Sequence, residues 1–137
     1  ARRSQQESVT SATQIYLADT MGEMPLLFQT ADLAFMGGSL VPVGGHNLLE
    51  PAALAKATLI GPHFFNFSDI TRQLVEKKAC RLVHNENELA TTVLELLSTK
   101  EECHKMGMQG FDVVAANQGA LAKSLSEIEK VMGLFQR

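Results

Sequence analysis

Short apolar runs alternate with helical patterns over most of the sequence, and no other feature constrains the fold as strongly. Largely apolar runs of three or four residues that stop at turn-forming residues are typical of buried strands. Four such runs occur, at residues 15–18, 33–36, 58–60 and 81–83. Runs this short and apolar on both faces suit parallel strands covered by helices. The sequence therefore predicts an α/β fold in which a Rossmann-like, doubly wound parallel sheet is flanked by helices.

Helix signals fill the intervals between these runs. Capping boxes, in which a polar residue is followed three residues later by Glu, predict three helix starts: Thr20 with Glu23, Asn85 with Glu88, and Thr99 with Glu102. Another helix is expected to begin at Ser68, and a short one near Asn47. The last segment spaces apolar residues alternately four and three apart, which predicts a long amphipathic helix that closes the chain: Leu121, Leu125, Ile128, Met132 and Phe135.

The composition excludes several classes of protein. The 137 residues are 45% hydrophobic and 20% charged, with a net charge of −3, which suits one soluble domain with a single core. No basic run suggests a nucleic-acid partner, and no apolar stretch approaches the ~20 residues that span a bilayer. Cys80 and Cys103 lack zinc-ligand spacing and are expected to be reduced, packed thiols. The start at Ala1, without Met or an apolar signal segment, indicates a processed chain or a piece of a longer one.

Three loops follow predicted strands and carry unusual residues. They are the first loop (residues 19–23), the second loop (residues 37–51) and the third loop (residues 61–67). In open α/β sheets, ligands bind beyond the carboxyl ends of the strands, where such loops converge. We therefore expect these three loops to contain the site.

The second loop is the most informative of the three. Its two Gly-Gly pairs, which begin at Gly37 and Gly44, precede the expected helix near Asn47, so backbone N–H groups can approach a phosphate closely. Glu50 falls in the first turn of that helix, where a carboxylate can accept hydrogen bonds from two ribose hydroxyls. Amide donors for a phosphate beside a carboxylate for a ribose would suit a nucleotide.

Simpler interpretations remain open for each feature. Paired glycines are more often turn residues than a ligand cradle, Glu50 is also suited to the positive end of the helix dipole, and Glu23 can complete its capping box. His46 and His63 lack a third metal ligand at suitable spacing, so hydrogen bonding is the favoured role for both.

The phenylalanines of the third loop also have two interpretations. They can stack on a base or a sugar, or they can anchor the loop in the core. We favour the anchor for this group: Phe64, Phe65 and Phe67.

Three motifs together resemble a known family. Asp-Thr-Met-Gly-Glu at residues 19–23, the segment at residues 37–53 with its Gly-Gly-His-Asn core, and Gly-Pro-His with Asn-Phe at residues 61–67 recur in order in 3-deoxy-D-manno-octulosonic acid (Kdo) transferases. Residues 117–120 also resemble the closing segment of that family. The similarity covers most of the chain, and departures occur where many relatives have Pro in place of Leu48, Gly in place of Ala55 and Pro in place of Ala57.

The resemblance implies the C-terminal half of a GT-B glycosyltransferase. Residues 1–137 would then form a C-terminal domain that binds the donor CMP-Kdo. The full enzyme would transfer Kdo to a lipid A precursor with inversion and without a metal, at the cytoplasmic face of the inner membrane of a Gram-negative bacterium. The general base, the acceptor contacts, a basic CMP-binding segment and any membrane anchor would lie upstream of Ala1, so the isolated chain is expected to be soluble and inactive.

The resemblance also implies which residues bind CMP. Two segments match the CMP-contacting segments of the family: Met21, Gly22 and Glu23 in the first loop, and Asn47, Leu48, Leu49 and Glu50 in the second. No residue of the chain matches a catalytic base or a metal ligand. Two other functions stay open, namely a nucleotide-binding module without catalysis and a GT-B transferase that uses a UDP-sugar.

Overall fold

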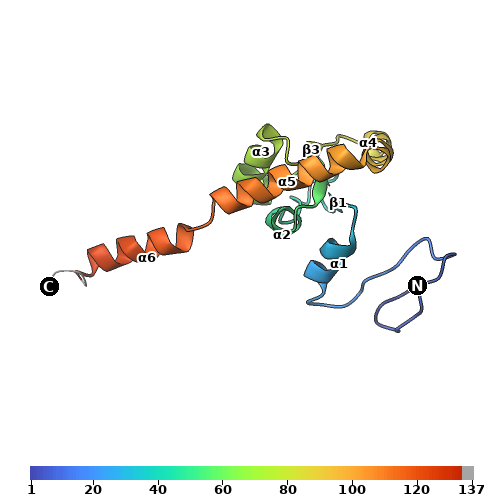
Figure 1. Cartoon of the computed structure of the whole chain (residues 1–137), viewed down its shortest axis with the longest axis horizontal. Coiled ribbons are helices and arrows are strands. Elements are labelled where there is room, and N and C mark those ends of the chain that lie inside the picture. Colours follow the sequence, from blue (N-terminus) through green and yellow to red (C-terminus); the bar gives the residue numbers. More distant parts are fainter. Residues whose placement is uncertain (134–137) are drawn as a thin grey trace.

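Three parallel strands form the centre of the molecule (Figure 1). The computed structural model describes residues 1–133, apart from the side chains of residues 120–123. The strands β1 (Leu33–Met36), β2 (Ala57–Ile60) and β3 (Arg81–Leu82) lie in the order β1-β2-β3. Leu33 of β1 pairs with Ala57 of β2, and Leu59 of β2 pairs with Arg81 of β3. The predicted parallel α/β fold is confirmed, together with three of its four predicted strands.

The fourth prediction, a buried strand at residues 15–18, is wrong. Only one isolated parallel bridge forms there, between Arg2 and Leu17. Ile15 is 78% exposed and Leu17 is 48% exposed. An apolar run becomes a strand only when a neighbouring strand pairs with several of its residues in succession, and this run finds one such pair.

Helices connect the strands and cover the sheet. They are α1 (Met24–Thr30), α2 (Leu49–Ala53), α3 (Ser68–Glu76), α4 (Glu86–Ser98), α5 (Lys100–Ala116) and α6 (Ala120–Val131), with a 3₁₀ turn, η1 (Phe65–Phe67). Figure 1 shows α5 running along the body of the molecule and α6 continuing away from it. No helix within the described residues is long and apolar enough to cross a membrane.

The core lies on both faces of the sheet. Every residue of β2 is buried, and because successive side chains of a strand point to opposite faces, Leu59 and Ile60 enter different clusters. Ile60 packs with Met36, Leu48 and Leu74, whereas Leu59 packs with residues of α4 and α5. Burial on both faces explains why the strands are nearly continuous apolar runs.

The two cysteines are free thiols, as expected. Cys80 is buried in the core, and burial raises the pKa of its thiol to about 12. Cys103 is half-buried, and desolvation raises its pKa as well. Both thiols therefore stay protonated at neutral pH and behave as packed side chains.

One of the three predicted capping boxes forms a true cap. The side chain of Asn85 accepts a hydrogen bond of 2.9 Å from the backbone N–H of Glu88 at the start of α4. The other two predictions are wrong as caps: α1 begins at Met24 with Glu23 itself as the preceding residue, and Thr99 makes no side-chain cap to α5. In each case an arginine from elsewhere in the chain engages the glutamate of the predicted box.

Two glycines allow α5 to lie directly against the connection between α2 and β2. A Cβ added to Gly107 would lie 1.9 Å from the carbonyl oxygen of Ala55, and one added to Gly110 would lie 3.3 Å from the Cβ of Ala52. Ala55 itself has a φ of +53°, a conformation that favours glycine. The close contact fixes α2 against the body of the domain.

The predicted closing helix is present as α6, but its apolar side is not covered by described residues. Leu125, Ile128 and Met132 are 49%, 52% and 64% exposed. The side chain of Leu121 and the whole of Phe135 lie outside the described residues.

Candidate nucleotide site at the carboxyl edge of the sheet

The second and third loops meet where β1 and β2 end, and a buried serine joins them. Ser39 is fully buried; its hydroxyl donates to the carbonyl of Met36 and accepts a hydrogen bond of 2.8 Å from the backbone N–H of Gly61. The carbonyl of Ser39 accepts a further bond of 2.9 Å from the N–H of His63. The serine therefore ties the end of β1 to the segment that follows β2.

Glycines let these two loops approach each other more closely than side chains would permit. A Cβ on Gly61 would lie 2.2 Å from the carbonyl oxygen of Ser39, and one on Gly44, whose φ is +105°, would lie 2.4 Å from Nδ2 of Asn66. The N–H of Gly45 is used inside the loop, because it donates to the carbonyl of Gly38 at 3.0 Å. Turn geometry therefore accounts for most of the glycines of the second loop.

The second loop ends in the short helix α2, whose first two residues are exposed. The side chain of Asn47 accepts a hydrogen bond of 3.0 Å from the N–H of Leu49, so the helix begins at Leu49, close to the predicted start. Glu50 lies in the first turn and is exposed. Leu48 is only 1% exposed, so its side chain is not available to a ligand.

The first loop is more exposed than the second. Met21 is 97% exposed, and Gly22, with a φ of +82°, has nothing within 4 Å of an added Cβ. The carboxylate of Glu23 accepts hydrogen bonds from Arg3, with Nη2 to Oε1 at 2.7 Å and Nε to Oε2 at 3.0 Å, and it contacts the Thr20 hydroxyl. Hydrogen bonds from Arg3 and then Thr20 lower the pKa of Glu23. The loop therefore presents an open glycine turn beside a charged carboxylate that is already paired.

The two predicted segments lie at the starts of neighbouring helices. The first loop leads directly into α1, and α1 contacts α2, whose first turn carries Glu50. Backbone N–H groups at helix N-termini attract anions, so each segment can offer such donors, and the second also carries the exposed carboxylate of Glu50.

The remaining predictions for these loops have mixed outcomes. Phe64 packs against the core cluster, as expected of an anchor, but Phe65 is 61% exposed. His46 is exposed and His63 is half-buried. Within residues 1–133, no group of three or more His, Cys, Asp or Glu side chains is arranged to hold a metal ion.

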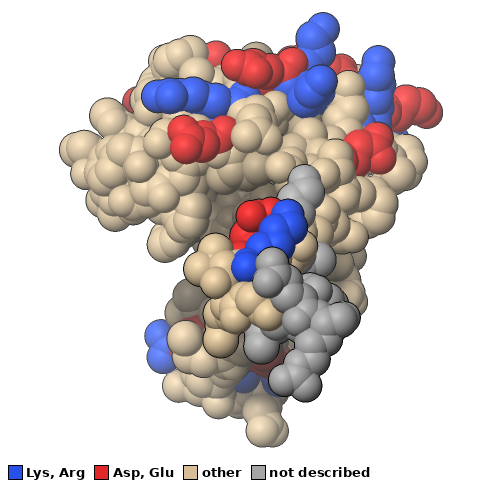
Figure 2. Space-filling model, turned by 90° about the vertical axis from the view of Figure 1, so that its left-hand side faces the viewer, with Lys and Arg blue, Asp and Glu red and all other residues tan. Residues whose placement is uncertain are grey.

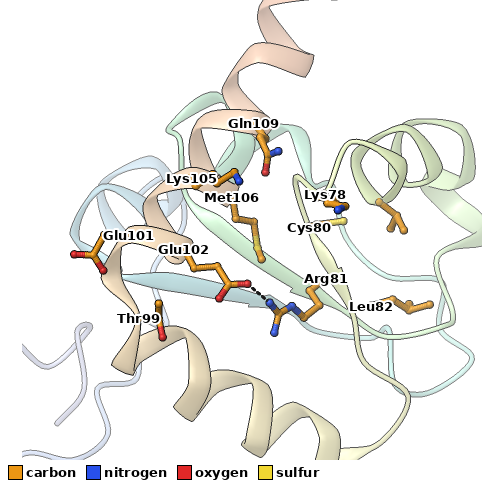
Figure 3. Close-up of a pocket in the computed structure, with 11 residues that line it drawn as sticks. Lys78, Cys80, Arg81, Leu82, Thr99, Glu101, Glu102, Lys105, Met106 and Gln109 are labelled. Atoms are coloured by element: carbon orange, nitrogen blue, oxygen red, sulfur yellow. Dashed lines mark hydrogen bonds and ion pairs between the residues drawn. The ribbon is translucent and has the colours of Figure 1, made fainter.

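A cavity that the sequence does not predict lies between the end of α3, β3 and the first half of α5 (Figure 3). It measures about 630 Å³, and none of its lining residues comes from the three loops. Arg81 crosses it and pairs with Glu95 and Glu102. No motif marks it, because its residues come from separate segments.

Charges of both signs are interspersed on the face shown in Figure 2. Lys and Arg side chains lie beside Asp and Glu, and the described residues of that face form no broad field of one sign. A nucleic-acid footprint would be a basic stripe, which this face lacks.

A parallel sheet whose polar loops gather at its carboxyl edge defines the class of Rossmann-like ligand-binding domains. The chain is 42% identical to a 3-deoxy-D-manno-octulosonic acid transferase of Haemophilus influenzae over 125 residues, which are 90% of this chain and 29% of the relative. It is 33% identical to the enzyme of the same name from Bordetella pertussis over 119 residues, which are 87% of this chain and 28% of that relative. No protein-family model matches the chain.

A solved structure shares both the fold and the sequence. The C-terminal CMP-Kdo binding domain of WaaA from Acinetobacter baumannii superposes with a TM-score of 0.79 at 36% identity, covering 83% of this chain and 60% of that one. The chain is therefore homologous to 3-deoxy-D-manno-octulosonic acid transferases, as its motifs indicate, and it spans under a third of the length of the two transferases above.

Proposed function

We propose that the chain is the donor-binding domain of a Kdo transferase and that it binds the CMP part of CMP-Kdo. The proposed contacts are those implied by the family motifs: Met21, Gly22 and Glu23 of the first loop, and Asn47, Leu48, Leu49 and Glu50 of the second. The observation that carries the proposal is the position of both segments at the starts of two helices, α1 and α2, that contact each other.

Each segment has a distinct part in this proposal. Backbone N–H groups around Gly22 and the N–H of Glu50 would donate to the phosphate, since helix N-termini favour anions. The N–H of Leu49 is taken by Asn47. The exposed carboxylate of Glu50 would accept hydrogen bonds from the ribose hydroxyls. Leu48, whose side chain is in the core, would mainly hold the start of α2 in place beside the ligand.

In the complete protein, the reaction would be transfer of Kdo to a lipid A precursor at the cytoplasmic face of the bacterial inner membrane. Charge builds on the leaving phosphate as the bond to Kdo breaks, and amide donors already aimed at it would stabilise that charge. We assign no general base to this chain and expect the acceptor and the base to be contributed by another domain. The reaction is proposed to need no metal ion, so EDTA should leave CMP affinity unchanged.

The test is a titration of the chain with CMP, UMP and ADP, followed by calorimetry or amide chemical shifts. Preference for CMP, with shifts concentrated in residues 21–23 and 47–50, supports the proposal. Preference for UMP would instead indicate a UDP-sugar transferase, and equal binding of all three would indicate a nucleotide-binding module without donor specificity. In the CMP case, no Kdo transfer should be detected with the chain alone.

A further inference from the structure

The N-terminal residues hold the first loop in place through charged side chains. Arg3 forms a two-pronged ion pair with Glu23, and the N–H and hydroxyl of Ser4 both donate to Asp19, at 2.9 Å and 2.8 Å. The backbone of Arg3 also donates to the carbonyl of Leu17 at 2.8 Å. Both carboxylates of the first loop are thus engaged by residues 2–4.

The ion pair of Arg3 has two consequences for an anion at Gly22. An unpaired Glu23 carboxylate would repel a phosphate that approached the turn, because like charges at short range are unfavourable. The guanidinium removes that repulsion. One nitrogen of the guanidinium is left free by the described residues. Nε and Nη2 bond to Glu23, whereas Nη1 has no hydrogen-bond partner among residues 1–133.

The guanidinium is accessible as well as paired. The side chain of Arg3 is 42% exposed and that of Glu23 is 27% exposed. An arginine that is held at one edge by a carboxylate can donate from its other edge without losing further side-chain freedom, and its planar fork suits phosphate oxygens.

We propose that Arg3 is a phosphate-binding residue of the donor site, held by Glu23 and left with Nη1 free to donate to an anion at the first loop. This inference rests on the proposed function, and it adds a residue that the family motifs do not include. It also explains why the first loop combines an exposed glycine turn with an acidic residue, an otherwise unfavourable surrounding for an anion.

The test compares a ligand that has a phosphate with one that lacks it. CMP and cytidine share base and ribose, but only CMP carries the phosphate, with a charge of about −1.5 to −2 at neutral pH. Replacing Arg3 by Ala should weaken CMP binding about tenfold, the usual loss for a hydrogen bond to a charged group. Cytidine binding should change by less than about twofold, because it makes no phosphate contact.

Two further variants separate charge, geometry and folding. Arg3→Lys keeps the charge without the fork and should restore part of the CMP affinity. Arg81→Ala is the matched control, because it removes another arginine that pairs with two carboxylates, on the edge strand β3, and it should leave the CMP-to-cytidine ratio unchanged. If Arg3→Ala does not fold, Arg3→Gln provides the same comparison.

The outcomes are distinguishable. Equal losses for CMP and cytidine in Arg3→Ala would mean that Arg3 only shapes the loop, and unchanged binding of both would mean that it has no part in the site; either result overturns the inference. Failure of the unaltered chain to bind CMP would contradict the proposed function itself. A selective loss of CMP binding, partly rescued by Lys, is the expected result.

Discussion

The first and second loops contribute to the same proposed site but are held by different interactions. The second loop is fixed from inside, by the buried hydroxyl of Ser39 and by close backbone contact with Gly61. The first loop is fixed from outside, by the partly exposed pair of Arg3 with Glu23. Buried hydrogen bonds and packing persist over a wide range of pH and salt, whereas exposed ion pairs are weaker and are screened by salt. The conformation of the second loop should therefore depend little on pH and salt, whereas that of the first loop should depend on both.

The largest effect is expected where the second loop touches the third. Gly61→Ala places a Cβ 2.2 Å from the carbonyl of Ser39, so backbone must move, and the free energy of unfolding should fall by about 3 kcal/mol. Urea unfolding measures this change in the free energy of unfolding. Gly37→Ala is the control, because a Cβ there meets nothing within 4 Å; equal losses in both variants would contradict the close contact.

Ser39→Ala should have the next largest effect. It leaves the N–H of Gly61 and the carbonyl of Met36 without their buried partner, which costs about 1 to 3 kcal/mol. Ser98→Ala removes a hydroxyl that bonds to a carbonyl within the exposed end of α4 and should change stability by less than about 0.5 kcal/mol. A Ser39→Ala protein as stable as the Ser98→Ala protein would show that the hydroxyl does not join the loops.

Glu50→Ala tests the binding side of the second loop rather than its stability. Loss of a carboxylate that accepts ribose hydroxyls should weaken CMP binding about tenfold, with the melting temperature nearly unchanged because Glu50 is exposed. Asp69→Ala is the matched control, since Asp69 also stands exposed in the first turn of a helix, α3. Equal CMP affinity in the two variants would remove Glu50 from the proposed site.

The smallest effect concerns acid pH and the first loop alone. Arg3 and Thr20 lower the pKa of Glu23 from its ordinary 4.5, and hydrogen bonds from Ser4 lower that of Asp19 from 3.8. Groups with a lowered pKa stabilise the fold above their unfolded-state pKa, and this contribution is lost as the pH falls through the folded-state pKa. Amide chemical shifts of residues 19–23 should therefore change below pH 4.5 while those of residues 37–48 stay constant. Simultaneous change in both loops would mean that they are not held independently.

Much of the fold was predictable because its signals are local. The strands β1, β2 and β3 are short apolar runs bounded by turn residues, and the Asn85 cap depends on a residue three positions away. The run at residues 15–18 has the same local pattern but only one bridge partner. Strand formation depends on a neighbour, which no single run specifies.

The position of the candidate site follows from local sequence signals and stays a prediction, and its detail depends on the tertiary structure. Loops beyond the strands and an early acid in α2 follow from local sequence, and the family motifs name the same residues. No local pattern indicates that Glu23 pairs with Arg3, twenty residues away, or that the side chain of Leu48 enters the core. The partners of a charged side chain depend on which segments the fold brings together.

The sequence by itself determined the alternation of strands and helices, the turns that end β1 and β2, and the segments that carry polar residues at the carboxyl edge. Tertiary structure alone decided which of those residues are free to meet a ligand, since it buried Leu48, enclosed Ser39 and paired Glu23 with Arg3. The reason is range: backbone preference and periodicity act over a few residues, whereas burial and ion pairing depend on distant segments that meet only in the folded chain.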